Sequence, residues 1–187
     1  MTPGAPRRAD AQRNRDRLLA AAETALNMHG ADASLDDIAK AAGVGNATLY
    51  RHFPTRAALI EAVYDQRIAA LCDQAAELSR TREPGRALHE WLHALVAHIT
   101  GDRILAEAFM ATRDDPGGAD PPQIAAWHAA IHAAAAPLLT AAHGAGTIRA
   151  DLDFMELMAL TAAVARAAHP AQAGRFLDIL LEGITPR

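Results

Sequence analysis

The amino-acid sequence predicts an all-α protein, and both its composition and its hydrophobic pattern support this. Aromatic residues make up only 4% of the 187 residues while alanine is abundant, which favours closely packed helices over a sheet rich in β-branched and aromatic side chains. Apolar residues recur at intervals of three and four along most of the chain, and no strand–helix–strand alternation is visible. We therefore expect helices only, arranged in one sizeable domain or two small ones.

Composition also limits the class of protein to which the chain can belong. A hydrophobic content of 51% with 21% charged residues is ordinary for a soluble globular protein. The N-terminus lacks the apolar run of a signal peptide, and His128, His132 and Pro137 interrupt the alanine-rich stretch 125–142, so we expect no membrane span. The single Cys72 suits a reducing compartment, and its apolar neighbours favour a buried, inert thiol over a redox sensor. These features predict a cytoplasmic protein.

The first two helices are expected near the N-terminus. Apolar residues at helical spacing predict a helix over about residues 11–28, with Gly30 beyond its end. Ser34 stands just before a second apolar run, where its hydroxyl can accept the backbone N–H of Asp37 and cap the helix. Gly43 ends this second helix at a position suited to a positive φ.

A third helix follows this turn. Leu49 and Phe53 lie four residues apart on one of its faces, where they can pack against the second helix. A long fourth helix begins at Thr55, which can cap it, and runs to about Arg80. Residues 34–53 thus have the layout of a helix-turn-helix, in which the second helix enters the major groove of DNA.

The rest of the chain predicts further helices separated by loops. Asp153 and Glu156 have the spacing of a capping box, and Pro170 suits the first turn of the last helix. The clearest loop is the stretch 114–122, which is rich in Asp, Gly and Pro. The helices expected beyond Arg80 span about residues 84–99, 104–112, 124–144, 153–168 and 170–184.

Around the turn the chain resembles the tetracycline-repressor (TetR) family of transcription regulators. The motifs that carry the resemblance are Ile38-Ala39-Lys40-Ala41-Ala42-Gly43-Val44 and Thr48-Leu49-Tyr50-Arg51-His52-Phe53, with support from Arg17–Ala22, Gly30 and Arg56–Leu59. The resemblance implies a three-helix DNA-binding domain at residues 11–55, a helical ligand-binding and dimerisation domain at 56–187, and ligand-responsive repression of transcription. The chain departs from the family at Gly45-Asn46-Ala47, where many members have a serine and a basic residue followed by glycine.

Charge and side-chain chemistry indicate which residues would contact DNA. Residues 1–56 hold eight basic and six acidic side chains, whereas residues 57–187 hold ten and sixteen, so the positive excess is N-terminal. Asn46, Thr48 and Arg51 are the candidates for base edges, and the small Gly45 and Ala47 allow the backbone to approach the groove. The candidates for phosphate contacts are Ser34, Lys40, Tyr50, His52 and Arg56.

Five further arginines lead into the first helix, at positions 7, 8, 13, 15 and 17. Such a cluster can form an arm that reaches phosphates or the minor groove. For Arg7 and Arg8 the alternative, a solvated tail that only aids solubility, has equal weight.

A group of mostly apolar residues in the second half of the chain predicts a pocket for a small-molecule effector. Such pockets are lined by apolar and aromatic side chains with a few polar groups that orient the ligand. The alternative for each of these residues is that it belongs to the core. The candidates are Trp91, Leu95, His98, Phe109, Met110, Trp127, His128 and Ile131.

The last two expected helices, 153–168 and 170–184, each carry an apolar stripe that a lone domain of this size would struggle to cover. Two copies could pair these helices in a four-helix bundle with two-fold symmetry. Such a homodimer presents two recognition helices to successive major grooves, so we expect a near-palindromic operator in double-stranded DNA.

The sequence leaves three competing functions open. The i,i+4 pairs His89/His93 and His128/His132 could complete a four-coordinate site in a metal-sensing regulator, although no cysteine lies nearby and we expect neither a metal nor a cofactor. The second is a helical ligand-binding protein or enzyme without a DNA role, but the chain has no Gly-rich phosphate loop and no nucleophile elbow, so we expect no enzyme activity. The third is a structural DNA-binding protein that responds to no effector.

Overall fold

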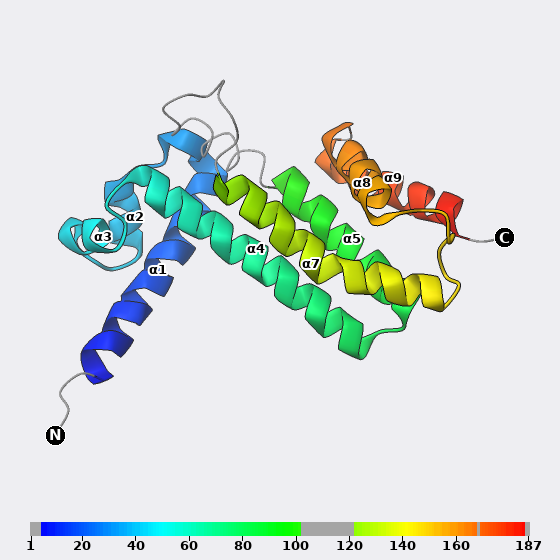
Figure 1. The fold of residues 1–187 in the computed structure, drawn as a ribbon. Coiled ribbons are helices and arrows are strands. Elements are labelled where there is room, and N and C mark those ends of the chain that lie inside the picture. Colours follow the sequence, from blue (N-terminus) through cyan, green and yellow to red (C-terminus); the bar gives the residue numbers. More distant parts are fainter. Residues whose placement is uncertain (1–4, 102–121, 168, 186–187) are drawn as a thin grey trace. The chain divides into compact units, whose positions relative to one another are not determined.

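The computed structural model is helical throughout the part of the chain that it describes, apart from short connections (Figure 1). The described residues are 5–101, 122–167 and 169–185. The all-α prediction is therefore confirmed for these residues. The helix expected at 104–112, which carries Phe109 and Met110, lies outside the described residues.

The chain forms two compact units. The N-terminal unit ends at Gln66 and the C-terminal unit begins at Arg67, and α4 (Arg56–Thr81) supplies residues to both. The domain boundary expected from the sequence lies between residues 55 and 56, at the start of this helix, whereas the compact units divide within it. That domain boundary stays a prediction.

The N-terminal unit packs α1 against α2 and places α3 beside α2. α1 begins at Ala5 and not near residue 11, because the alanines and arginines of this stretch favour a helix, so Arg7 and Arg8 have a helical backbone. The core consists of fully buried side chains from all four helices: Leu18, Leu26, Ile38, Leu49, Leu59 and Ile60. The elements of this unit are α1 (Ala5–His29), a 3₁₀ turn (Gly30–Asp32), α2 (Leu35–Ala41), α3 (Asn46–His52) and the start of α4.

Both helix caps that the sequence predicts in this unit are present. The backbone N–H of Asp37 donates to Ser34 Oγ at 3.2 Å, and that of Ala58 donates to Thr55 Oγ1 at 3.1 Å. Each cap satisfies a backbone donor that the first turn of a helix leaves without an intrahelical partner. Local sequence signals therefore define where α2 and α4 begin.

The C-terminal unit is organised around α5, which packs against three other helices (Figure 1). Trp91 of α5 is fully buried, and its indole N–H donates to the carbonyl of Leu71 in α4 at 3.1 Å. The thiol of Cys72 donates to the carbonyl of Ala130 at 3.6 Å and joins α4 to α7 in the same way. The elements of this unit are the remainder of α4, α5 (Pro84–Gly101), α7 (Pro122–Gly144), α8 (Phe154–Ala167) and α9 (Pro170–Ile184).

The last two helices begin as their sequence predicts. The N–H of Asp153 donates to Glu156 Oε2 at 2.9 Å and the N–H of Glu156 donates to Asp153 Oδ1 at 2.8 Å, which completes the capping box. Pro170 opens α9. The cap of this helix was not predicted from the sequence: the Nδ1 atom of His169 accepts the N–H of Ala171 at 3.4 Å.

By length and mean hydropathy (1.3), α7 could cross a membrane, and among the described helices it alone meets these criteria. Its apolar character comes mainly from alanine, and Ala135, Leu138 and Leu139 are buried in the core of the C-terminal unit. We therefore interpret α7 as a helix that packs one side on the core of this unit, with a minority of its residues buried.

Candidate nucleic-acid interface

Backbone hydrogen bonds fix the turn between α2 and α3. Gly43 has a φ of +66°, a conformation that costs a glycine little. Its N–H donates to the carbonyl of Lys40, and the N–H of Val44 donates to the carbonyl of Ala39, both at 3.0 Å. These two bonds form a Schellman motif, which ends α2 and turns the chain into α3.

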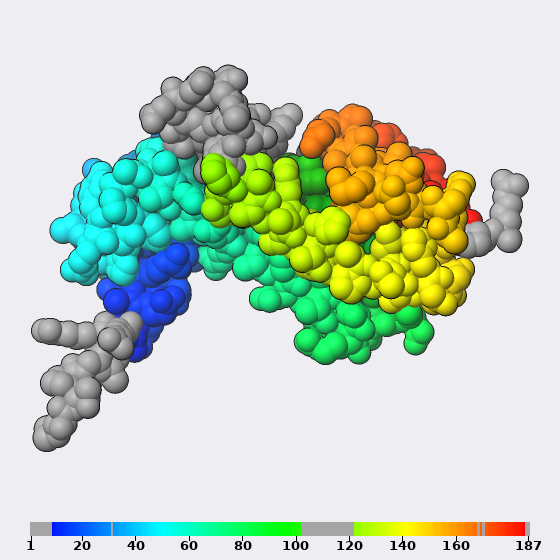
Figure 2. All heavy atoms as spheres, in the orientation of Figure 1, coloured from blue at the N-terminus to red at the C-terminus, as the bar shows by residue number. Residues whose placement is uncertain are grey.

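The two faces of α3 differ sharply. Leu49 and the adjoining Phe53 are only 1% and 3% exposed and hold the helix on the N-terminal unit. Tyr50, by contrast, is 48% exposed, and Asn46, Ala47 and Arg51 are exposed as well. In the space-filling view the cyan segment that contains α3 lies open at the surface (Figure 2). The helix thus presents a phenol, a guanidinium and an amide to the solvent.

The other predicted contact residues of this element differ in exposure. Ser34, Lys40 and Gly45 are exposed, whereas Thr48 is half-buried. Gly45 is the N-cap of α3 and has no side-chain oxygen to accept a backbone N–H, and no atom lies within 4 Å of the position that a Cβ would take. A close approach of another molecule to the backbone here meets no side chain.

Asn46 makes a contact that the sequence analysis missed. Its Nδ2 atom donates to Asp36 Oδ1 at 2.7 Å, which joins the start of α3 to α2. Reading an adenine requires both the donor and the acceptor of the amide, so Asn46 would have to release Asp36 for that role. The carboxylate of Asp36 also adds a negative charge beside the surface expected to meet DNA.

Two predicted phosphate contacts are turned into the protein. The Nε2 atom of His52 is buried and has no hydrogen-bond partner among the described residues, so the ring would have to rotate before this atom reached a phosphate. The guanidinium of Arg56 donates to the carbonyl of Ala33 at 2.6 Å and is half-buried. In this structure Arg56 ties α4 to the connection before α2.

Three arginines of α1, at positions 13, 15 and 17, also have partners within the unit. Arg15 lies over the ring of Phe53, with its Cζ atom 5.6 Å from the ring centroid, in a cation–π contact. Arg17 donates to Asn14 at 2.5 Å, and Arg13 pairs with Asp10. These pairs are exposed, so they contribute little to stability and leave positive charge at the surface of α1.

Comparisons with known proteins match both units. Residues 18–63 match the family described as bacterial regulatory proteins of the tetR family. Residues 83–186, more than half of the chain, match the C-terminal domain of SbtR-like transcriptional regulators. The chain belongs to the TetR family. Its members are DNA-binding transcriptional regulators, so the family assignment identifies this chain as a regulator of transcription.

Solved structures and a curated relative support the assignment to the TetR family. The crystal structure of a TetR regulator from Streptomyces coelicolor has 38% sequence identity to this chain and a TM-score of 0.76. The match covers 92% of this chain and 98% of that one. The crystal structure of a TetR regulator from Mycobacterium vanbaalenii has 34% sequence identity to this chain and a TM-score of 0.79. The match covers 97% of this chain and 100% of that one. The transcriptional regulator UidR of Escherichia coli is 34% identical over 124 residues, which span 63% of this chain and 58% of UidR.

The predicted effector-pocket residues of this TetR protein occupy different environments. Trp91 and Leu95 belong to the core of the C-terminal unit, and Trp127 is also buried. His98 and Ile131 are half-buried, whereas His128 is exposed and therefore does not belong to the core.

Two hollows among the described residues are not lined by these side chains. One is an open groove of about 550 Å³ between α1 and α2, and the other has about 70 Å³ near Gly85 and Thr147. Phe109 and Met110 lie outside the described residues. The effector pocket of this TetR protein thus stays a prediction.

Two of the shifted pKa values in the C-terminal unit belong to side chains that the sequence singles out, His98 and Cys72. Burial, assisted by the charge of Arg67, lowers the pKa of His98 to about 4, so its imidazole is neutral at physiological pH. Burial raises the pKa of Cys72, and the nearby carboxylate of Asp73 adds to this effect. A raised pKa reduces the thiolate fraction, which agrees with the inert thiol that the sequence predicts.

Proposed function

We propose that this TetR-family regulator is a ligand-responsive repressor that binds a near-palindromic operator as a homodimer in the cytoplasm. The observation that carries the proposal is the outward face of α3, which holds Tyr50 and Arg51 in the open while Leu49 is buried beneath them. A helix held on its unit by a buried face, with donors on the other, has the arrangement needed to enter a major groove.

Within this proposal the side chains divide into two roles. Arg51 reads a base edge, because a guanidinium matches the two acceptors of guanine. Tyr50 and Lys40 contact phosphates, and Ser34 supports them from the start of α2. Asn46 and Thr48 complete the base-reading set once Asn46 leaves Asp36, and His52 and Arg56 join the phosphate contacts after rotating outward.

The proposed homodimer interface is the outer face of α8 and α9. Four large apolar side chains are exposed there, namely Met155 (66%), Leu160 (40%), Phe176 (42%) and Ile179 (56%). An exposed apolar patch of this kind is typical of an interface between subunits. Since α8 and α9 pack on each other within one chain, two copies would form a four-helix bundle.

The proposed effector is a small, mostly apolar molecule that binds beside Trp127 and weakens the binding of the protein to DNA. The described members of the predicted pocket lie on α5 and α7, and α4 is one continuous helix that contributes to both units. An effector need only prefer the non-binding state by about 1–3 kcal/mol to weaken DNA binding roughly 5- to 150-fold. An effector that releases DNA should change tryptophan fluorescence, and Trp127→Ala should abolish both responses.

Fluorescence anisotropy with labelled DNA from the region upstream of the protein's own gene tests the proposed function. We expect saturable binding at nanomolar concentrations, tighter than binding to random DNA. The logarithm of the binding constant should fall linearly with the logarithm of the salt concentration. Equal, weak binding to both DNAs would remove the operator-specific role. A complete absence of DNA binding would favour the alternative function, a ligand-binding protein that has no DNA role.

A further inference from the structure

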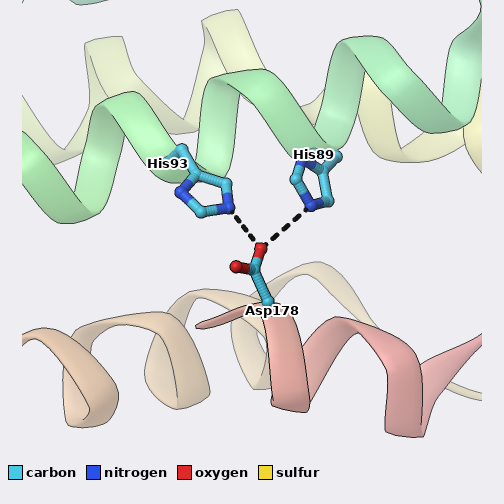
Figure 3. Close-up of side chains that lie close together, drawn as sticks. All are labelled: His89, His93 and Asp178. Atoms are coloured by element: carbon cyan, nitrogen blue, oxygen red, sulfur yellow. Dashed lines mark hydrogen bonds and ion pairs between the residues drawn. The ribbon is translucent and has the colours of Figure 1, made fainter. Parts of the chain in front are cut away.

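A cluster of three side chains in the C-terminal unit plays no part in the proposed function. His89 and His93 lie about one helical turn apart on α5, and both point at Asp178 of α9 (Figure 3). The Nε2 atoms of His89 and His93 lie 3.2 Å and 2.8 Å from the same carboxylate oxygen, Asp178 Oδ1. The two rings are 4.6 Å apart between centroids, so the three groups converge on one point.

We propose that His89, His93 and Asp178 form a binding site for a divalent transition metal, with Zn²⁺ as the best match. One ligand atom from each residue lies within 4.8 Å of the other two. A tetrahedral zinc ion with bonds of about 2.0–2.2 Å holds its ligand atoms about 3.3 Å apart, so small side-chain movements would admit the ion. The carboxylate would supply a negative charge that the two neutral imidazoles lack.

The types of ligand select the class of metal. Two imidazole nitrogens and one carboxylate oxygen suit zinc and its neighbours, whereas calcium and magnesium prefer oxygen ligands alone. The site has no thiolate, which argues against a preference for copper(I). When Nε2 binds the metal, the proton of each neutral imidazole resides on Nδ1, so the hydrogen bonds to Asp178 are exchanged for metal bonds.

The surroundings allow a metal ion to enter. The side chains of His89 and Asp178 are 47% and 48% exposed, and that of His93 is 32% exposed. Gly174, one turn before Asp178 on α9, faces the His93 ring, because a Cβ at that position would lie 3.7 Å from the ring Nδ1 atom. Three protein ligands leave a fourth position for water, the arrangement of an accessible rather than a closed zinc site.

The second histidine pair provides an internal comparison. His128 and His132 have the same i,i+4 spacing on α7 and are exposed, but within the described ranges no third ligand accompanies them. The ring of His132 lies 4.3 Å from that of Phe154 in an edge-on contact instead. The sequence left open a site built from both pairs, whereas in this structure the partner of the first pair is a carboxylate from α9. This inference does not depend on the proposed operator binding.

Calorimetric titration of the full-length chain with Zn²⁺ tests the proposed site, after treatment with chelator and without a polyhistidine tag. We expect one ion per chain, with affinity reduced about tenfold or more in Asp178→Asn and in His93→Gln. The double variant His128→Gln/His132→Gln should bind like the wild type. Co²⁺, as a coloured substitute, should develop visible absorption bands in the wild type and in that control but not in Asp178→Asn.

The result is decisive in either direction. Absence of saturable Zn²⁺ binding, or equal binding by the wild type and Asp178→Asn, would show that the three residues form only a hydrogen-bonded cluster. Loss of binding in the His128/His132 variant alone would place the site on α7. Circular dichroism checks that each variant is folded. If Asp178→Asn does not fold, His89→Gln, a change at an exposed residue, replaces it in the test.

Discussion

At the scale of single residues, the position of His98 predicts how stability depends on pH. Its pKa in the folded chain is about 4, whereas an unfolded chain has a histidine pKa of about 6.5. The unfolded state therefore binds more protons between these values, so the stabilisation is complete above pH 6.5 and is lost as the pH falls toward 4. We expect His98 to account for a loss of about 1–2 kcal/mol between pH 7 and pH 5.

Urea unfolding at pH 7 and pH 5 measures this contribution. His98→Gln should lower the difference in unfolding free energy between the two pH values by that amount, whatever it does to the stability at pH 7. The exposed His128→Gln is the control and should keep the pH dependence of the wild type. An unchanged dependence in His98→Gln would contradict the assignment.

Single residues also show where prediction from the sequence succeeds. The caps at Ser34 and Thr55 and the left-handed Gly43 follow from interactions within a few residues, so their chemistry is visible in the sequence. The bonds of Asn46 to Asp36 and of Arg56 to Ala33 join segments that are ten and twenty-three residues apart. Their partners depend on how the helices pack, which periodicity does not specify.

At the scale of elements, periodicity identifies an apolar helix but does not say which apolar residues face inward. The stripe of α9 divides in the structure, since Leu177 is fully buried in its own unit, Leu180 packs on the core and Ile179 is 56% exposed. The proposed metal site could likewise be predicted only in part. The spacing of His89 and His93 is visible in α5, but Asp178 comes from a helix far along the chain.

The exposed part of α9 carries the prediction for assembly. Ile179→Glu should convert the proposed dimer into a monomer at micromolar concentration, because burying an isoleucine contributes about 1.5–3 kcal/mol and a two-fold interface contains it twice. Light scattering coupled to gel filtration measures the mass. Met28→Glu, a matched change at a residue that is 70% exposed in the N-terminal unit, should leave it unchanged. A dimer that survives both Ile179→Glu and Phe176→Glu would place the interface elsewhere.

At the scale of the whole molecule, charge is unevenly distributed along the sequence. The net charge of the chain is −4, yet residues 1–56 carry a positive excess, so the acidic surplus lies in the rest of the chain. A basic N-terminal segment followed by an acidic remainder would favour one orientation toward a polyanion. The class of protein was predictable because the motif around Gly43 is local, while the effector depends on packing that the sequence does not specify.

The central claim is that the outward face of α3 reads the operator. The most direct test is the affinity ratio between operator and random DNA, measured by anisotropy for the wild type, Arg51→Ala and Arg80→Ala. Arg80→Ala removes the same charge from α4 in the C-terminal unit and should keep the wild-type ratio. Arg51→Ala should lower the ratio by about 5- to 150-fold, the equivalent of about 1–3 kcal/mol for one base contact. A ratio that Arg51→Ala leaves unchanged would contradict the claim.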